Sequence, residues 1–186
     1  MSAPYSERRY AFIKGLHVLH AAADSGNAAR QAASRQTLAG LRRGLATGQP
    51  QLGAHEIVFR HDPPDSELEV WLLIAGLFAT NPHRTLAKRS LGTSMRTLQE
   101  LRGDAATRRF DQLLQIDRAA LPHHLRQVIR LLASDNIPIN YAGLLDDLVV
   151  LLGDNHQDKA AHRVRLRWAR DFHTAPATTA TTATTD

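Results

Sequence analysis

The spacing of apolar residues constrains the fold of this chain more than any other feature of its sequence. Leu125, Val128, Ile129 and Leu132 recur at intervals of three and four, which places them on one face of an α-helix. Similar spacing recurs along most of the chain, and only the short run 56–59 is strand-like. We therefore expect an all-α protein, an elongated helical bundle of about seven to nine helices in two packed halves.

Start and stop signals place these helices along the sequence. Pro122 suits the first turn of a helix, and Asn140 can cap the helix that follows. The run 70–79 is apolar on every side, which indicates a buried helix, and Asn81-Pro82 ends it. We expect helices over about 6–25, 27–46, 66–80, 92–101, 104–117, 121–134, 141–152 and 159–172.

Composition divides the chain into segments. Residues 48–66 are rich in Gly, Pro and His and predict a long loop. This loop lies in an N-terminal helical half, residues 1–103, which precedes a C-terminal helical bundle, residues 104–173. Residues 174–186 are mostly Ala and Thr, a composition that cannot bury enough apolar surface to order itself. We expect this tail to be disordered.

Some classes of protein are excluded by what the sequence lacks. Cysteine is absent, which rules out disulfides, thiolate-bound metals and a cysteine nucleophile. The longest apolar run, 70–79, is shorter than the roughly 18 residues that a membrane helix needs. The first 25 residues lack the apolar core of a signal peptide. We therefore expect a cytoplasmic protein that does not enter a membrane.

Candidate catalytic groups lack the partners that their chemistry needs. His17 and His20 lie three residues apart on one helix, but no third ligand follows at a fixed spacing. The His61-Asp62 pair lies in the predicted loop, whereas a metal-binding dyad needs a helix and further ligands. Asp146 and Asp147 diverge by about 100° on a helix, so we interpret them as a solvated or partner-facing edge. We expect no enzymatic activity, metal or cofactor; an enzyme that uses His17, His20 or His61 is the weakest alternative.

Basic residues carry more information than these candidates. The formal net charge is +5, and of the 23 basic residues all but three are arginine, whose planar charged group suits phosphate. Several arginines share helix faces through spacings of four or seven residues, which fits contacts to a nucleic-acid backbone that do not depend on base sequence. The predicted nucleic-acid-binding residues are Arg30, Arg35, Arg42, Arg43, Arg126, Arg130, Arg163, Arg167 and Arg170.

Several short segments, taken in order, also resemble a known family. The most specific is the run Trp-Ala-Arg-Asp-Phe at 168–172, preceded by Arg167. Over about residues 30–173 the chain is similar to the CasB family, the small subunit of the type I-E CRISPR surveillance complex (Cascade). The other matching segments are 38–44, 71–79, Ser90-Leu91-Gly92 with Leu98, Arg108-Arg109-Phe110, 121–126, 137–141, Leu144-Leu145 and Asp147-Leu148.

The resemblance implies an all-helical, non-catalytic subunit of a larger assembly that serves antiviral defence. It implies contacts with the large subunit, with the backbone subunit and with a second copy of the chain. It also implies that basic surface contacts crRNA, target DNA and the displaced single-stranded DNA of the R-loop. Because guide pairing supplies sequence specificity, such a subunit needs arginines at phosphate spacing and no base reader. The alternative is a free-standing helical DNA-binding regulator.

Overall fold

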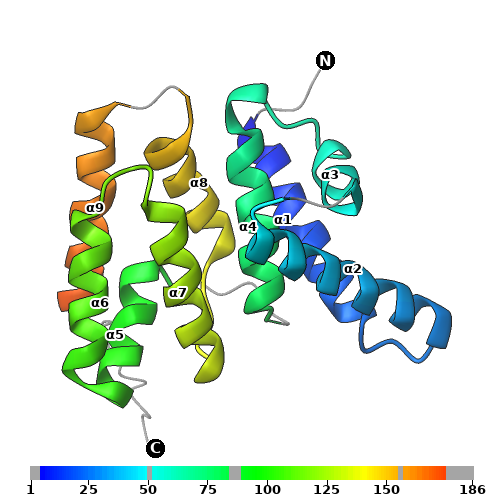
Figure 1. Cartoon of the computed structure of the whole chain (residues 1–186), viewed down its shortest axis with the longest axis horizontal. Coiled ribbons are helices and arrows are strands. Elements are labelled where there is room, and N and C mark those ends of the chain that lie inside the picture. The colour runs from blue at the N-terminus through cyan, green and yellow to red at the C-terminus, as the bar shows by residue number, and fades with distance from the viewer. Residues whose placement is uncertain (1–4, 50–51, 84–88, 155–156, 175–186) are drawn as a thin grey trace, which may run out of the picture.

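The structure, a computed structural model, describes residues 5–49, 52–83, 89–154 and 157–174. Within these ranges the regular structure consists of nine α-helices and one 3-10 helix, which confirms the predicted all-α fold. The helices form two groups that lie side by side, one built from residues up to 80 and the other from residues 91–173 (Figure 1).

Local capping signals set the bounds of the first helices. Asn27 accepts a hydrogen bond of 3.0 Å from the backbone N–H of Arg30, and so caps the second helix. Gly48 ends that helix with a φ of 71°, a conformation that glycine adopts readily. The N-terminal group contains α1 (Tyr5–Ala22), α2 (Ala28–Thr47), α3 (Leu52–Phe59), the 3-10 helix η1 (Asp65–Glu67) and α4 (Leu68–Thr80).

The segment 48–66 differs from its prediction. It was expected to be a loop with a strand-like run at 56–59, and both expectations are wrong because α3 lies within it and η1 begins in it. Ala54 and Val58, four residues apart, are buried on the face of α3 that packs against α2 and α4. The helical period therefore prevails over the β-propensity of a short run, because α2 and α4 cover the face of α3 that carries both side chains.

The C-terminal group follows the sequence signals closely. Pro122 lies in the first turn of its helix, and the Asn140 side chain accepts a hydrogen bond of 3.0 Å from the backbone N–H of Gly143, as predicted. Two helices keep the predicted bounds, and the others differ from them by at most two residues at either end. The group contains α5 (Leu91–Arg102), α6 (Asp104–Gln115), α7 (Leu121–Ser134), α8 (Tyr141–Leu152) and α9 (Asp158–His173).

Packing assigns α5 to the C-terminal group. This helix lies against α6 and α9, and a Cβ atom on Gly92 would lie 2.1 Å from the carbonyl oxygen of Trp168. By packing, the groups therefore divide between α4 and α5, whereas the division at residue 103 into an N-terminal helical half and a C-terminal helical bundle stays a prediction. The predicted tail, 174–186, lies outside the described residues apart from Thr174.

Helix α4 is the centre of the molecule. Every residue from Val70 to Ala79 is buried, which confirms the prediction of a helix that is apolar all round. One side of α4 packs against α2 and α3, and the other side packs against α7 and α8, so the two groups share one hydrophobic core. None of the described helices is long and apolar enough to span a lipid bilayer.

A buried carboxylate holds the tryptophan of each group. Glu67 accepts a hydrogen bond from Trp71 Nε1, and Asp147 accepts one from Trp168 Nε1. The interpretation of Asp147 as part of a solvated or partner-facing edge was therefore wrong. Its carboxylate is needed where the indole N–H would otherwise be buried without a partner. Asp146, next to it, is exposed as expected.

Candidate nucleic-acid interface

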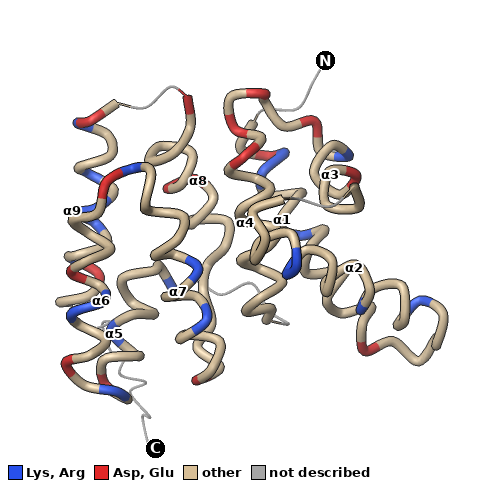
Figure 2. The backbone as a smooth tube through the Cα atoms, in the orientation of Figure 1, with Lys and Arg blue, Asp and Glu red and all other residues tan. Residues whose placement is uncertain are grey.

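Three of the predicted arginines meet where the two groups of helices face each other. A cavity of about 380 Å³ is lined by Arg42 and Arg43 on α2, by Arg130 on α7 and by four uncharged residues. We call this cavity the arginine cleft. Figure 2 shows basic residues on α7 and on the part of α2 nearest to it. The remaining lining residues of the cleft are Ala39, Leu45, Ala46 and Thr80.

The arginines of the cleft are available to an anion. Arg42 Nη1 donates a hydrogen bond of 3.2 Å to the carbonyl oxygen of Ala79, which anchors the side chain at the end of α4. Arg43 and Arg130 are exposed, and neither has an ion pair or a side-chain hydrogen bond with any described residue. Guanidinium groups without carboxylate partners keep all their donors free for phosphate oxygens.

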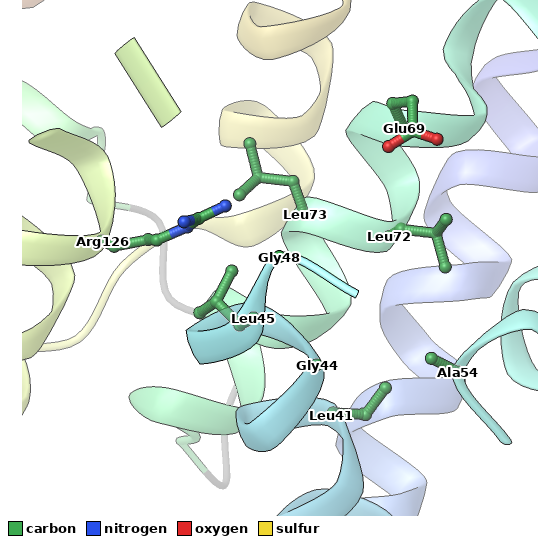
Figure 3. A pocket seen from close by; sticks show the side chains of 9 residues that line it. All are labelled: Leu41, Gly44, Leu45, Gly48, Ala54, Glu69, Leu72, Leu73 and Arg126. Atoms are coloured by element: carbon green, nitrogen blue, oxygen red, sulfur yellow. The ribbon is translucent and has the colours of Figure 1, made fainter. Parts of the chain in front are cut away.

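Arg126 extends the basic surface into a neighbouring pocket. It lies one helical turn before Arg130 and reaches from α7 towards Leu73 on α4 and Leu45 on α2 (Figure 3). Its Nε atom is buried without a hydrogen-bond partner among the described residues. The pocket beyond it has a volume of about 460 Å³ and also contains Glu69. A half-buried cation with an unpaired donor is costly to stability.

The other predicted arginines of α2 lie nearer the N-terminus of that helix. Arg35 Nε donates a hydrogen bond of 3.1 Å to the Ala23 carbonyl, and Arg30 is exposed in the first turn. Seven residues of helix separate Arg35 from Arg42, a distance of about 10 Å. The structure therefore places them on the same helix as the cleft but outside it.

The three predicted arginines of α9 are on a different part of the molecule. Helix α9 lies at the opposite side of the structure from α2 (Figure 1). Arg167 forms an ion pair with the buried Asp147, so its charge is already engaged within the chain. Arg163 Nε donates to the Lys159 carbonyl, and Arg170 is exposed with no described partner for its side chain. Sequence spacing had suggested one stripe, whereas the structure gives these residues different surroundings.

One basic residue of this region was missed by the sequence analysis. Arg118, between α6 and α7, lines the same pocket as Arg126 and donates hydrogen bonds to the carbonyl oxygens of Leu152 and Gly153. No helical spacing identifies it, because it precedes the helix that carries Arg126. The only signal in the sequence was its position a few residues before Pro122.

The histidines once considered for catalysis have packing roles. The His17 Nδ1 atom lies 2.8 Å from the carbonyl oxygen of His83, and burial lowers the pKa of His17. The His61 ring packs against Phe12, with ring centroids 5.6 Å apart, and burial also lowers the pKa of His61. In the part of the chain that the structure describes, no group of three or more potential ligands could hold a metal ion.

Comparison with known proteins identifies one family. The model of the family described as CRISPR-associated protein Cse2 matches residues 37–173. This range covers the part of α2 that carries the arginine cleft and continues to the end of α9. A search of curated protein sequences finds no match.

Several solved structures have a similar fold. CasB from M. ruber is 27% identical, with a TM-score of 0.64 over 89% of this chain and 91% of that one. CasB from Thermus thermophilus is also 27% identical, with a TM-score of 0.65 over 94% of this chain and 100% of that one. A chain of a CRISPR RNA-guided surveillance complex is 21% identical, with a TM-score of 0.67 over 91% and 92% of the two chains, a likeness of fold.

Proposed function

The chain belongs to the CRISPR-associated Cse2 family, and on this basis we propose that it is the small, non-catalytic subunit of a type I-E CRISPR RNA-guided surveillance complex (Cascade). Family membership confirms the resemblance to CasB that the sequence shows. A structure of similar fold belongs to an RNA-guided surveillance complex, which supports the proposal. The partners we propose are the large subunit, the backbone subunit, a second copy of this chain, crRNA, target DNA and the displaced single strand.

The role that we propose within the complex is to stabilise the R-loop through contacts with nucleic-acid backbone. Formation of an R-loop exchanges one duplex for another of similar stability, so a few protein–phosphate contacts are enough to favour it. These contacts do not need to distinguish bases, because the guide pairs with the target. A subunit in this role needs exposed cations, held in place and not neutralised by acidic neighbours.

The arginine cleft is the observation that carries this proposal. Arg43 and Arg130 come from different helices, are exposed and have no carboxylate partner among the described residues. Arg42 and Arg126 add charge beside them. Four guanidinium groups in one region form a surface to which a polyanion binds with release of its counterions. Arg163 and Arg170 on α9 stay predicted contacts, either with nucleic acid or with a neighbouring subunit.

The proposal is tested in the assembled complex with a double variant, Arg43→Ala with Arg130→Ala. We expect the affinity for matched target DNA to fall about tenfold at low salt, because two phosphate contacts are lost. The slope of log affinity against log salt concentration should shrink by about 1.5, since each phosphate contact contributes roughly 0.7 to 0.9. Target affinity is measured by titration at several salt concentrations.

A matched control removes two arginines elsewhere. Arg108 and Arg109 on α6 are exposed, so Arg108→Ala with Arg109→Ala changes the net charge equally without touching the cleft. If both double variants weaken target binding to the same extent, the effect comes from net charge and the cleft is not the interface. Sequence-specific duplex binding by the isolated chain would instead support the free-standing regulator.

A further inference from the structure

The arginine cleft is shared between two groups of helices that touch mainly elsewhere. Its walls come from α2 and the end of α4 on one side and from α7 on the other. The closely packed helix pairs that join the groups are α4 with α7, α4 with α8 and α1 with α8. Helices α2 and α7 are not among them, so the two helices that carry the arginines of the cleft are not themselves a closely packed pair.

Polar contacts also join the two groups of helices. Arg9 on α1 donates a hydrogen bond of 2.9 Å from Nη1 to Asp146 on α8, while its Nε atom donates to Glu67. The Asn81 side chain, just after α4, donates a hydrogen bond of 2.9 Å to the carbonyl oxygen of Ile137. These contacts hold α8 and the segment before it against the N-terminal group.

The charges of the cleft oppose that docking. Arg42 and Arg43 on one group and Arg130 on the other are all cationic, and no described carboxylate lies among the residues that line the cleft. Like charges on the two sides of the cleft repel each other. A phosphate between them reverses the sign of the interaction, because each guanidinium group can donate to its oxygens.

From this arrangement we infer that a backbone phosphate in the arginine cleft bridges the two groups of helices, so that nucleic-acid binding and docking of the groups are coupled. The inference rests on the proposed function and adds to it a specific mode of binding. The coupling is reciprocal: an anion in the cleft strengthens the docking, and a weakened docking contact lowers the affinity for the anion.

The first test changes a docking contact and leaves the cleft intact. Asp146→Asn removes the carboxylate that Arg9 contacts and makes the chain more positive by one charge, which by itself favours a polyanion. We nevertheless expect the full-length chain to bind a 20-nucleotide oligothymidylate more weakly, by up to about fivefold, which is the upper limit for loss of an exposed ion pair. Asp111→Asn on α6 is the control, because Asp111 is exposed and has no described partner.

The second test measures the docking directly. Because the chain has no cysteine, Ala33→Cys on α2 and Gln127→Cys on α7, both at exposed positions, give two unique sites for spin labels. We expect addition of the oligothymidylate to narrow the distribution of distances between the labels. Arg43→Ala with Arg130→Ala in the labelled chain should abolish the narrowing.

The outcomes separate this inference from the proposed function. If Arg43→Ala with Arg130→Ala binds the oligonucleotide as the unmodified chain does, the cleft is not the interface and both proposals fail. If that variant loses affinity, but Asp146→Asn binds as tightly as Asp111→Asn and the distances do not change on binding, only the coupling is overturned. The spin-label measurement uses unmodified docking contacts, so it decides the question even where Asp146→Asn folds poorly.

Discussion

The Trp168 indole nitrogen on α9 donates a hydrogen bond of 2.6 Å to the Asp147 carboxylate on α8. Trp71 makes the same kind of bond, 3.0 Å long, to Glu67 in the N-terminal group. Both indoles are fully buried, so each carboxylate satisfies an N–H that has no access to water. The largest side chain of each group is thereby fixed in orientation as well as packed.

Asp147 therefore contributes to stability through the acceptor it offers. Asp147→Ala leaves the Trp168 N–H unpaired, and we expect the free energy of unfolding to fall by about 2–4 kcal/mol. Burial raises the pKa of Asp147, so the charge itself is disfavoured in the folded protein. Asp147→Asn keeps an acceptor and should cost about 1 kcal/mol. Urea unfolding of both variants checks this; equal losses would show that the charge, not the acceptor, matters.

Stability should fall as the pH is lowered below about 6.5. Burial lowers the pKa of His17 and of His83 in the folded protein. The folded state therefore binds protons at these histidines more weakly than the unfolded state does. Their contribution to the free energy of unfolding is fully present above the unfolded pKa, and it is lost as the pH falls from that value towards the lower folded pKa. Urea unfolding between pH 5 and 8 measures the dependence. His17→Gln, which keeps a donor for the His83 carbonyl, should flatten it; an unchanged slope would contradict the assignment.

Two glycines in helices should respond to alanine in opposite ways. A Cβ on Gly92 would lie 2.1 Å from the Trp168 carbonyl oxygen, so Gly92→Ala must push α5 away from α9. We expect a loss of about 3 kcal/mol. Gly53 in α3 has no neighbour within 4 Å of such an atom, and Gly53→Ala should add about 0.5–1 kcal/mol. Thermal unfolding decides; stabilisation by Gly92→Ala would contradict the close packing of α5 on α9.

Arg126 should show opposite effects on stability and on binding. Its Nε atom is buried without a described partner, so Arg126→Met keeps the length of the side chain and removes an unsatisfied polar group. We expect stability to stay equal or rise by up to about 1 kcal/mol, while the affinity of the complex for target DNA falls. Arg43→Met, at an exposed position, should lower the affinity for target DNA and leave the stability unchanged. A large loss of stability in Arg126→Met would mean that the arginine is structural.

Local signals account for what the sequence could predict. The first-turn Pro122, the cap at Asn140 and the apolar stripe of α7 depend on residues close together in the chain, and the structure agrees with them. Helix α3 was missed because its flanking glycines and prolines resemble a loop and its apolar run is short. The burial of Asp147 was missed for another reason: its partner Trp168 is distant in sequence and the bond depends on packing of α9.

The candidate site was only partly predictable for the same reason. Spacing along α2 placed Arg35, Arg42 and Arg43 on one helix, but it could not show that Arg130 faces Arg42 and Arg43 from α7. That meeting depends on how the two groups dock through α4. Spacing also joined Arg167 to the stripe on α9, whereas its ion pair with Asp147 engages the charge. Helical spacing identifies a shared face, and only the tertiary structure shows what that face meets.

The most direct measurement of the central claim is photocrosslinking from inside the cleft. Ala46 is exposed and lines the cavity beside Arg42 and Arg43, so a benzoylphenylalanine at this position reports what occupies it. In the assembled complex bound to target, the account predicts a crosslink to nucleic acid that disappears when Arg43 and Arg130 are replaced by alanine. A crosslink only to a neighbouring protein subunit would contradict it.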